Sequence, residues 1–191
     1  SSVNKLPAFR LIVDQMNTVG VGSLGLVLVV SLFTGAVAAV QAAYQFSSVV
    51  PLKYIGSVIL RSVIIELGPV LTALVVGGRV GAAIAAELGS MKVTEQIDAL
   101  RAMGINPIRF LIVPRVVAAV IMLPVITIFS DAIAIFGGYV VAITSIGVTP
   151  HTYTQSLKDF FLLKDLMSGL IKAFFFGGII GRLMWYNVWF I

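Results

Sequence analysis

The chain has 191 residues, of which 59% are hydrophobic and only 11% are charged. Soluble domains carry about 25% charged residues, because a compact core needs a polar surface around it. The composition therefore excludes a soluble enzyme and predicts an all-α integral membrane protein with one domain over residues 1–191. The chain has no cysteine, which excludes disulfides and thiolate metal sites. Its Lys and Arg residues are spread thinly, so nucleic acid is not an expected partner.

The first 18 residues are too short and too charged to cross a bilayer. Their apolar side chains recur at helical spacing, in Leu6, Phe9, Ile12, Val13 and Met16. This pattern predicts a helix over residues 1–18 that lies in the membrane interface. No small-residue cleavage site follows a short apolar core, so a signal peptide is not expected.

Long stretches with few charges predict four membrane spans. No charged residue lies between Asp14 and Lys53, and this stretch is longer than the roughly 20 residues that a spanning helix needs. Three later stretches are similarly apolar. The predicted spans cover residues 21–44, 62–86, 116–146 and 166–191.

Basic residues in the loops predict the orientation of the chain. The loop between the second and third spans holds the most Lys and Arg residues, namely Lys92, Arg101, Arg109 and Arg115. Cytoplasmic loops carry such an excess. This loop is therefore expected in the cytoplasm together with both chain ends, and the loops 46–61 and 149–164 are expected outside.

The cytoplasmic loop contains a predicted amphipathic helix over residues 93–103. Val93, Ile97, Leu100 and Met103 fall on one face of this helix. Thr94 is a candidate for its N-cap, and Gly104 followed by Asn106-Pro107 predicts its end. The helix either rests on the bilayer surface or docks into a partner protein. The residues expected to contact such a partner are Thr94, Glu95, Gln96, Ile97, Asp98, Leu100, Arg101 and Met103.

Three ionisable residues lie within the predicted spans, and each has a structural and a functional interpretation. Glu66 is either a boundary residue with its carboxylate in water or part of a functional site. Arg79 is expected to reach the cytoplasmic surface, or to pair with Glu87 or a neighbouring helix. Asp131 lies near mid-bilayer, where it is either protonated and hydrogen-bonded or faces a polar cavity or a partner such as Arg79. The single histidine, His151, is not expected to bind metal.

Small residues recur every four positions in the second span, and such stripes let helices pack closely. The candidate packing residues are Gly77, Gly78, Gly81, Ala82 and Ala85. The pattern does not distinguish packing within one chain from packing between two copies.

The region from residue 66 to residue 115 resembles permeases of the MlaE/YrbE family. The resemblance rests on Glu66-Leu67-Gly68-Pro69, Gly78-Arg79-Val80-Gly81, Met91-Lys92-Val93-Thr94-Glu95-Gln96-Ile97-Asp98-Ala99-Leu100, Asn106-Pro107 and Val113-Pro114-Arg115. It implies a multi-pass permease of the bacterial inner membrane that moves phospholipids or related lipids. The implied partners are a second copy of the chain, a cytoplasmic ABC ATPase dimer and MCE-domain subunits. A small cytoplasmic regulatory subunit and membrane lipids complete the expected partners.

The sequence departs from this family pattern at two places. Many relatives carry a basic residue directly before the Glu-Leu-Gly-Pro block, where this chain has Ile65, and the nearest basic residue is Arg61. The family continues past the fourth span with a turn, a cytoplasmic loop and a fifth span, whereas here residues 181–187 replace that turn and the sequence shows four spans. Either the C-terminal end of the sequence is missing, or its last residues do not represent the family's sequence.

The family resemblance and the apolar spans together predict a lipid cavity near the outer surface. Its expected lining residues are Gln41, Tyr44, Glu66, Val70, Leu71 and Leu74. No Gly-Lys pair of a phosphate-binding loop occurs in the sequence. No cofactor is therefore expected in this chain, which is expected to be a transport subunit rather than an enzyme, and ATP and Mg²⁺ are expected on the partner ATPase. The alternative is an ion- or proton-coupled carrier, or a membrane scaffold, that works without an ATPase and uses Glu66, Arg79 and Asp131 as a relay.

Overall fold

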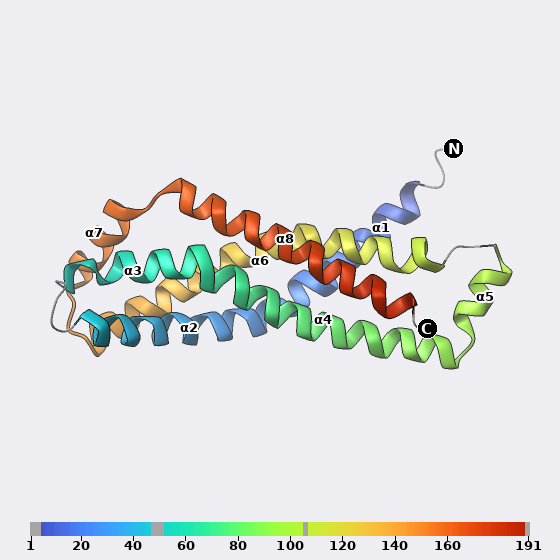
Figure 1. The fold of residues 1–191 in the computed structure, drawn as a ribbon, viewed down its shortest axis with the longest axis horizontal. Helices are drawn as coiled ribbons and strands as arrows, with labels where there is room; N and C mark the ends of the chain where they lie inside the picture. The colour runs from blue at the N-terminus through green and yellow to red at the C-terminus, as the bar shows by residue number, and fades with distance from the viewer. Residues whose placement is uncertain (1–4, 47–51, 105–106, 190–191) are drawn as a thin grey trace.

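The computed structural model describes residues 5–46, 52–104 and 107–189, and every regular element in these ranges is helical. The long helices run roughly side by side in an elongated bundle, with α5 at one end and α7 at the other (Figure 1). In chain order the elements are α1 (Lys5–Met16), η1 (Asn17–Val21), α2 (Gly22–Phe46), η2 (Leu52–Tyr54), α3 (Ile55–Ser62), η3 (Val63–Leu67), α4 (Gly68–Val93), α5 (Gln96–Ala102), α6 (Pro107–Thr144), α7 (Pro150–Phe160) and α8 (Leu163–Trp189).

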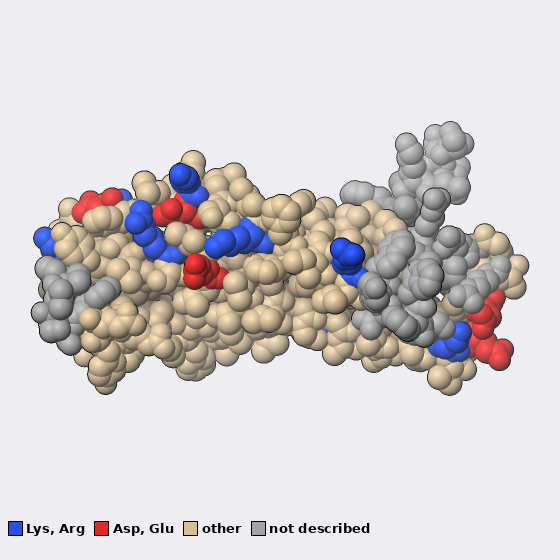
Figure 2. Space-filling view, viewed as in Figure 1, with Lys and Arg blue, Asp and Glu red and all other residues tan. Residues whose placement is uncertain are grey.

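Four helical stretches are long and apolar enough to cross a membrane, which confirms the predicted all-α membrane architecture. They cover Arg10–Gln45, Ile55–Val93, Ile112–Thr144 and Leu163–Leu183. The second stretch begins earlier than the predicted residue 62, because α3 continues into α4 through the π-helical segment η3. On the face drawn in Figure 2, charged side chains extend from the α7 end to the middle of the molecule and gather again at the α5 end, and most of the remaining described surface carries none.

The N-terminal helix is not a separate element. The first helix, α1, continues through the π-helical segment η1 directly into α2, and α1 lies against α6. The helix expected over residues 1–18 is therefore the first part of a longer helical stretch in the described residues. Its location in the membrane interface stays a prediction.

The interior of the bundle contains two apolar clusters. The first lies between α2, α4, α6 and α8 and includes Val76, Leu88 and Leu123, all of which are almost fully buried. The second joins α2, α3, α6 and α7 around Ile55 and Tyr153. Many large apolar side chains point outward instead, among them Phe33, which is 64% exposed. Outward-facing apolar side chains are expected of spanning helices, because the surrounding lipid is itself apolar.

Two glycines allow α2 and α6 to pack with their backbones in contact. A Cβ atom on Gly35 of α2 would overlap the carbonyl of Ala134, and a Cβ atom on Gly137 of α6 would overlap the carbonyl of Leu32. Each helix thus places a glycine against a backbone carbonyl of the other, which is how small residues promote helix association in membranes.

We expect Gly35→Ala to destabilise the protein by about 1–3 kcal/mol, because the added methyl group would force α2 and α6 apart. The matched control is Gly25→Ala in the same helix, where an added Cβ atom would meet no atom within 4 Å. The control should be neutral or stabilising by up to about 1 kcal/mol. Thermal melting of the purified complex in detergent tests this. Equal melting temperatures for the two variants would contradict the backbone contact.

Candidate functional site

A groove runs along the outside of α2 where this helix faces η3. Its first part has a volume of about 450 Å³ and is partly polar, and its second part has a volume of about 490 Å³ and is mainly apolar. The two parts share Ala38, Gln41 and Leu67 and are therefore continuous. The polar side chains of the first part are Gln41, Gln45, Arg61, Ser62 and Glu66. The second part is lined mainly by Val29, Val30, Phe33 and Val37 of α2, with Thr34 adding a hydroxyl group.

The π-helical segment η3 beside this groove has an identifiable cause in the sequence. Pro69 has no backbone N–H, so it cannot donate to the carbonyl of Ile65, four residues earlier. The ammonium group of Lys172 on α8 donates to this carbonyl instead, at 2.8 Å. The backbone N–H of Gly68 donates to Val63, five residues earlier, which is the π-helical pattern. An interhelical side chain therefore satisfies the backbone group that Pro69 leaves without a donor.

The close approach of α8 to η3 depends on a glycine. A Cβ atom on Gly169 would overlap the carbonyl of Ile64. Because Gly169 has no side chain, α8 lies directly on η3, one helical turn from Lys172. The sequence analysis did not identify Lys172 or Gly169 as functional residues. A proline within one span frees a backbone carbonyl, and a lysine within a later span can donate to it, so this combination could have pointed to Lys172.

The structure places the six predicted cavity residues in different environments. Gln41 and Glu66 both line the polar part of the groove. Tyr44 lines a separate hollow between α2 and the end of α6. Val70 and Leu74 lie on the exposed face of α4, with 39% and 66% of their surface exposed, and Leu71 is half-buried. Neither part of the groove includes these three residues, so their contact with lipid stays a prediction.

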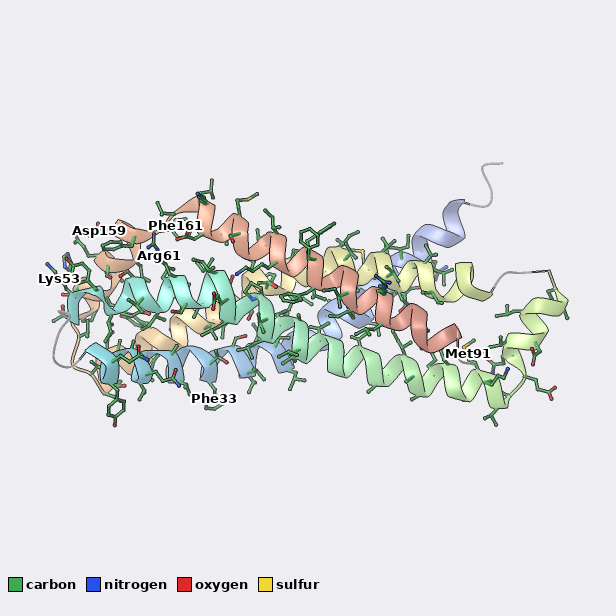
Figure 3. The ribbon with its side chains drawn as sticks, viewed as in Figure 1. Phe33, Lys53, Arg61, Met91, Asp159 and Phe161 are labelled. Carbon is green, nitrogen blue, oxygen red and sulfur yellow. The ribbon has the colours of Figure 1, made fainter. Side chains whose placement is uncertain are left out.

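Most residues that line the groove were not among the predicted cavity residues, and they include Ala38, Gln45, Leu67 and Arg61. Arg61 was noted only as the nearest basic residue to position 65. Arg61 and Glu66 are five residues apart, which is not the spacing of neighbours on an α-helix, and the sequence shows no sign of the π-helical segment η3. The guanidinium of Arg61 also reaches Asp165 at the start of α8, with 3.2 Å between Nε and Oδ2. Figure 3 shows Arg61 at the α7 end of the molecule, in the same region as Lys53 and Asp159.

The small residues of α4 divide between two faces. A Cβ atom on Gly77 would lie 3.2 Å from Ile180, so Gly77 faces α8 within the chain. Gly78 and Gly81 have no such neighbour within 4 Å, and Ala82 and Ala85 are exposed. Packing of these four residues against a second copy of the chain stays a prediction.

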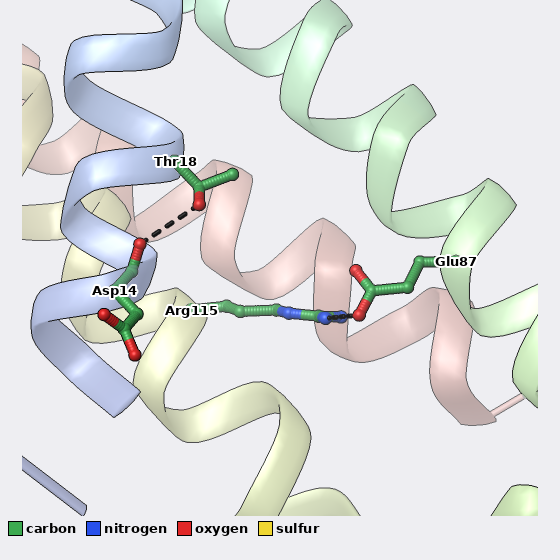
Figure 4. A network of polar contacts seen from close by, with 4 residues as sticks. All are labelled: Asp14, Thr18, Glu87 and Arg115. Carbon is green, nitrogen blue, oxygen red and sulfur yellow. Dashed lines mark hydrogen bonds and ion pairs between the residues drawn. The ribbon is translucent and has the colours of Figure 1, made fainter. Parts of the chain in front are cut away.

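The ionisable residues within the spanning helices do not form a common network in the described residues. Arg79 donates to the hydroxyl of Ser23 at 2.8 Å and to the carbonyl of Thr18 in η1 at 3.4 Å. The expected contact with a neighbouring helix is therefore present. Pairing with Glu87 is not, because Glu87 forms an ion pair with Arg115 (Figure 4), at 2.6 Å.

Asp131 of α6 is buried against α4. It contacts Gly68, where a Cβ atom would overlap its carboxyl group. Its Oδ1 atom has no hydrogen-bond partner in the part of the chain that the structure describes. Arg79 donates to Ser23 and Thr18 and shares no ion pair with Asp131 in these residues, so among the alternatives for Asp131 the one with Arg79 as partner is not seen.

The predicted loop helix is shorter than expected. Val93 belongs to the end of α4, and α5 begins at Gln96 and ends at Ala102 rather than covering residues 93–103. Thr94 does not act as the expected N-cap of the loop helix, since its hydroxyl donates to the carbonyl of Ser90 and so closes the last turn of α4. Glu95 turns the chain with a φ of 56°, a conformation that non-glycine residues seldom adopt.

The predicted apolar face of α5 is only partly covered. Ile97 is buried and Leu100 is half-buried, whereas Val93 and Met103 are 85% and 65% exposed. Glu95, Gln96 and Asp98 are also exposed, and the side chain of Arg101 lies outside the described residues. Apolar and acidic side chains are thus available together at one end of the molecule.

We expect Lys172→Met to destabilise the protein by about 1–3 kcal/mol, because the Ile65 carbonyl would lose its donor inside the bundle. Lys172→Arg should recover part of this loss, since it keeps a donor, and Lys164→Met is the matched control on an exposed part of α8. Melting temperatures of the three variants test this. Equal effects of the two Met variants would show that Lys172 does not support η3.

Comparisons with known proteins agree with this architecture. The family model described as "Permease MlaE" matches residues 12–188. A probable ABC transporter permease protein of Rickettsia typhi is 42% identical over 98% of this chain and 73% of its own length. The intermembrane phospholipid transport system permease protein MlaE of Haemophilus influenzae is 38% identical over 88% of this chain and 65% of its own length. The chloroplastic protein TRIGALACTOSYLDIACYLGLYCEROL 1 of Arabidopsis thaliana is 35% identical over 90% of this chain and 49% of its own length. With four spanning helices and a family match over nearly its whole length, this chain belongs to the MlaE family of ABC transporter permeases.

Proposed function

We propose that the chain is the membrane subunit of an ATP-driven transporter that moves phospholipids or related lipids between the bacterial inner membrane and the outer envelope. The observation that carries this proposal is the groove on α2, which is polar at one end and apolar along the rest. A lipid has the same division into a charged headgroup and apolar acyl chains. The "Permease MlaE" family match and the phospholipid transport named for the Haemophilus influenzae relative support the proposal.

The energetics of such a groove explain why ATP is needed. Each CH₂ group transferred out of water contributes about 0.8 kcal/mol, but a lipid that leaves a bilayer starts in hydrocarbon already. The apolar part of the groove therefore gains little free energy by accepting acyl chains and only has to match the bilayer. Direction must come from another source, which we assign to ATP and Mg²⁺ on a partner ATPase. In this proposal the chain itself is a transport subunit without enzymatic activity.

The partners follow from the exposed surfaces. The end of the molecule formed by α5 offers exposed acidic residues beside exposed Val93 and Met103, which suits docking of a helix into a groove of the ATPase dimer. The open stripe of small residues on α4 suits a second copy of the chain. MCE-domain subunits and a small cytoplasmic regulatory subunit are the further partners that the family leads us to propose.

The alternative of a carrier that works without an ATPase receives less support. A proton or ion relay needs groups that exchange hydrogen bonds with one another. Arg79 donates to Ser23 and Thr18, and the carboxyl group of Asp131 lies against Gly68. Glu66 instead lines the groove. Arg79, Asp131 and Glu66 therefore lie in separate surroundings in the described structure.

We expect Ala38→Phe to lower the amount of lipid that co-purifies with the complex, because Ala38 lies where the two parts of the groove meet. Lipid occupancy is measured by mass spectrometry of the intact complex. The control is Ala132→Phe, an exposed position on α6 that lines neither part of the groove. Unchanged occupancy in the Ala38 variant, with the complex assembled, would remove this groove from the lipid pathway.

We expect the double variant Glu95→Lys with Asp98→Lys to lower ATPase binding or lipid-stimulated ATP hydrolysis. Both residues are exposed at the α5 end, and reversed charges there would oppose basic groups on a partner. The control is Asp159→Lys, a charge reversal on α7 at the far end of the molecule. An ATPase that stays bound, with normal turnover in the double variant, would contradict docking through α5.

A further inference from the structure

Asp131 of α6 lies where this helix packs against η3 and the start of α4. A Cβ atom on Gly68 would overlap the Oδ1 atom of Asp131, and it would lie 3.1 Å from the carbonyl oxygen of Val63. The carboxyl group and the Val63 carbonyl oxygen therefore adjoin the same point between α6 and η3. Asp131 is only 4% exposed, so the two oxygens meet inside the bundle.

Two oxygen atoms on this interface have no hydrogen-bond partner in the described residues, the Oδ1 atom of Asp131 and the hydroxyl oxygen of Thr72. Thr72 follows Gly68 by four residues and so lies on the same face of α4. The buried hydroxyls of Ser31 and Thr127 donate to the carbonyl four residues earlier, but that of Thr72 does not. No hydrogen bond joins Thr72 to Asp131 either, so Thr72 does not provide Asp131 with a donor.

The ionisable groups of the elements around this part of α6 have other partners or surroundings. Lys172 of α8 donates to a carbonyl of η3, Arg79 of α4 donates to η1 and α2, Glu66 of η3 lines the groove, Arg61 of α3 pairs with Asp165 of α8, and Tyr153 of α7 donates to the carbonyl of Ile135. None of them neutralises Asp131. An unpaired charge inside a membrane is costly, and a carboxylate would also be repelled by the Val63 carbonyl oxygen.

A proton is the group that fits between these two oxygens. The Oδ1 atom of Asp131 and the hydroxyl oxygen of Thr72 have almost no surface that a water molecule could reach, and a bound water needs space of its own. A proton needs no such space, and it turns a carboxyl oxygen from an acceptor into a donor. The Val63 carbonyl accepts from the N–H of Gly68 and keeps a second lone pair for a further donor.

We propose that Asp131 is a proton-binding site, in which the neutral carboxyl group donates through Oδ1 to the carbonyl of Val63 and so holds η3 against α6. The segment η3 is then fixed from two sides, by Asp131 of α6 and by Lys172 of α8. Loss of the proton would set a carboxylate against a carbonyl oxygen and weaken the contact of η3, which carries Glu66 of the groove. This inference does not depend on the proposed lipid transport.

Infrared spectroscopy of the purified complex measures the protonation of Asp131 directly. The spectrum of the natural complex minus that of Asp131→Asn should contain, at neutral pH, the C=O stretching band of one protonated carboxyl group, which a carboxylate lacks. The matched control is Asp159→Asn on an exposed position of α7, whose difference spectrum should contain carboxylate bands only. A carboxylate signal for Asp131 at neutral pH would overturn the proposal.

Two substitutions of Asp131 separate the need for a donor from the need for a charge. Asn keeps a donor without a charge, so Asp131→Asn should assemble normally, keep its lipid occupancy and melt within about 2 °C of the natural complex. Leu has a similar size and no donor, so Asp131→Leu should lower the melting temperature by about 3 °C or more.

Three results in these variants would contradict the proton site. Failure of Asp131→Asn to assemble would show that the charge itself is needed. An unchanged melting temperature in Asp131→Leu would show that no hydrogen bond to η3 is lost. A melting temperature that is higher in sodium chloride than in potassium chloride for the natural complex, but not for Asp131→Asn, would show that the carboxyl group holds a cation instead.

Discussion

Backbone carbonyls that lose their helical donors are the constraint on which this bundle depends. Water is absent from the bilayer core, so each freed carbonyl must find a donor within the protein. In the described residues, the π-helical segments η1 and η3 each have a backbone carbonyl that accepts from a basic side chain of another helix. Lys172 of α8 donates to Ile65 in η3, and Arg79 of α4 donates to Thr18 in η1. In the sequence, basic residues within the spans suggest a role in transport. In the structure, Lys172 and Arg79 connect helices instead, so these charged residues have structural partners and do not form a relay.

These ties also determine where the groove lies. Pro69 interrupts the second span, and Lys172 and Gly169 hold α8 against the interruption. Arg61 and Glu66, on either side of the start of η3, both line the polar part of the groove. A regular helix through the same residues would direct the two side chains to different faces. A π-helical turn is less favourable than an α-helical one, and such turns are frequently found at functional sites. The position of η3 beside the groove agrees with that tendency.

Much of the fold could be predicted from charge and hydropathy alone, because the bilayer requires long apolar helices. All four spans follow from stretches with few charges, and Gln41 and Glu66, both predicted to line a lipid cavity, line the same part of the groove. The π-helical segments could not be predicted. A spanning helix has apolar side chains on all of its faces, so the sequence contains no periodic pattern that would reveal an extra residue in one turn. Arg61 was therefore left out of the site. Thr94 was misassigned for a different reason: its hydroxyl suits either the start of α5 or the end of α4, and only the path of the chain decides between them.

The division of the groove assigns different energetic tasks to its two parts. The walls formed by α2 resemble the bilayer, so acyl chains enter and leave with little change in free energy, and this part neither selects nor retains a lipid strongly. The charged end provides directional contacts that depend on the headgroup, in surroundings less polar than bulk water where such contacts gain strength. Arg61 stands on α3 and Asp165 stands at the start of α8, so their ion pair joins two helices beside the polar part of the groove. The position of the Arg61 guanidinium in the groove therefore depends on how these two helices pack, whereas the apolar part is formed mainly by α2 alone.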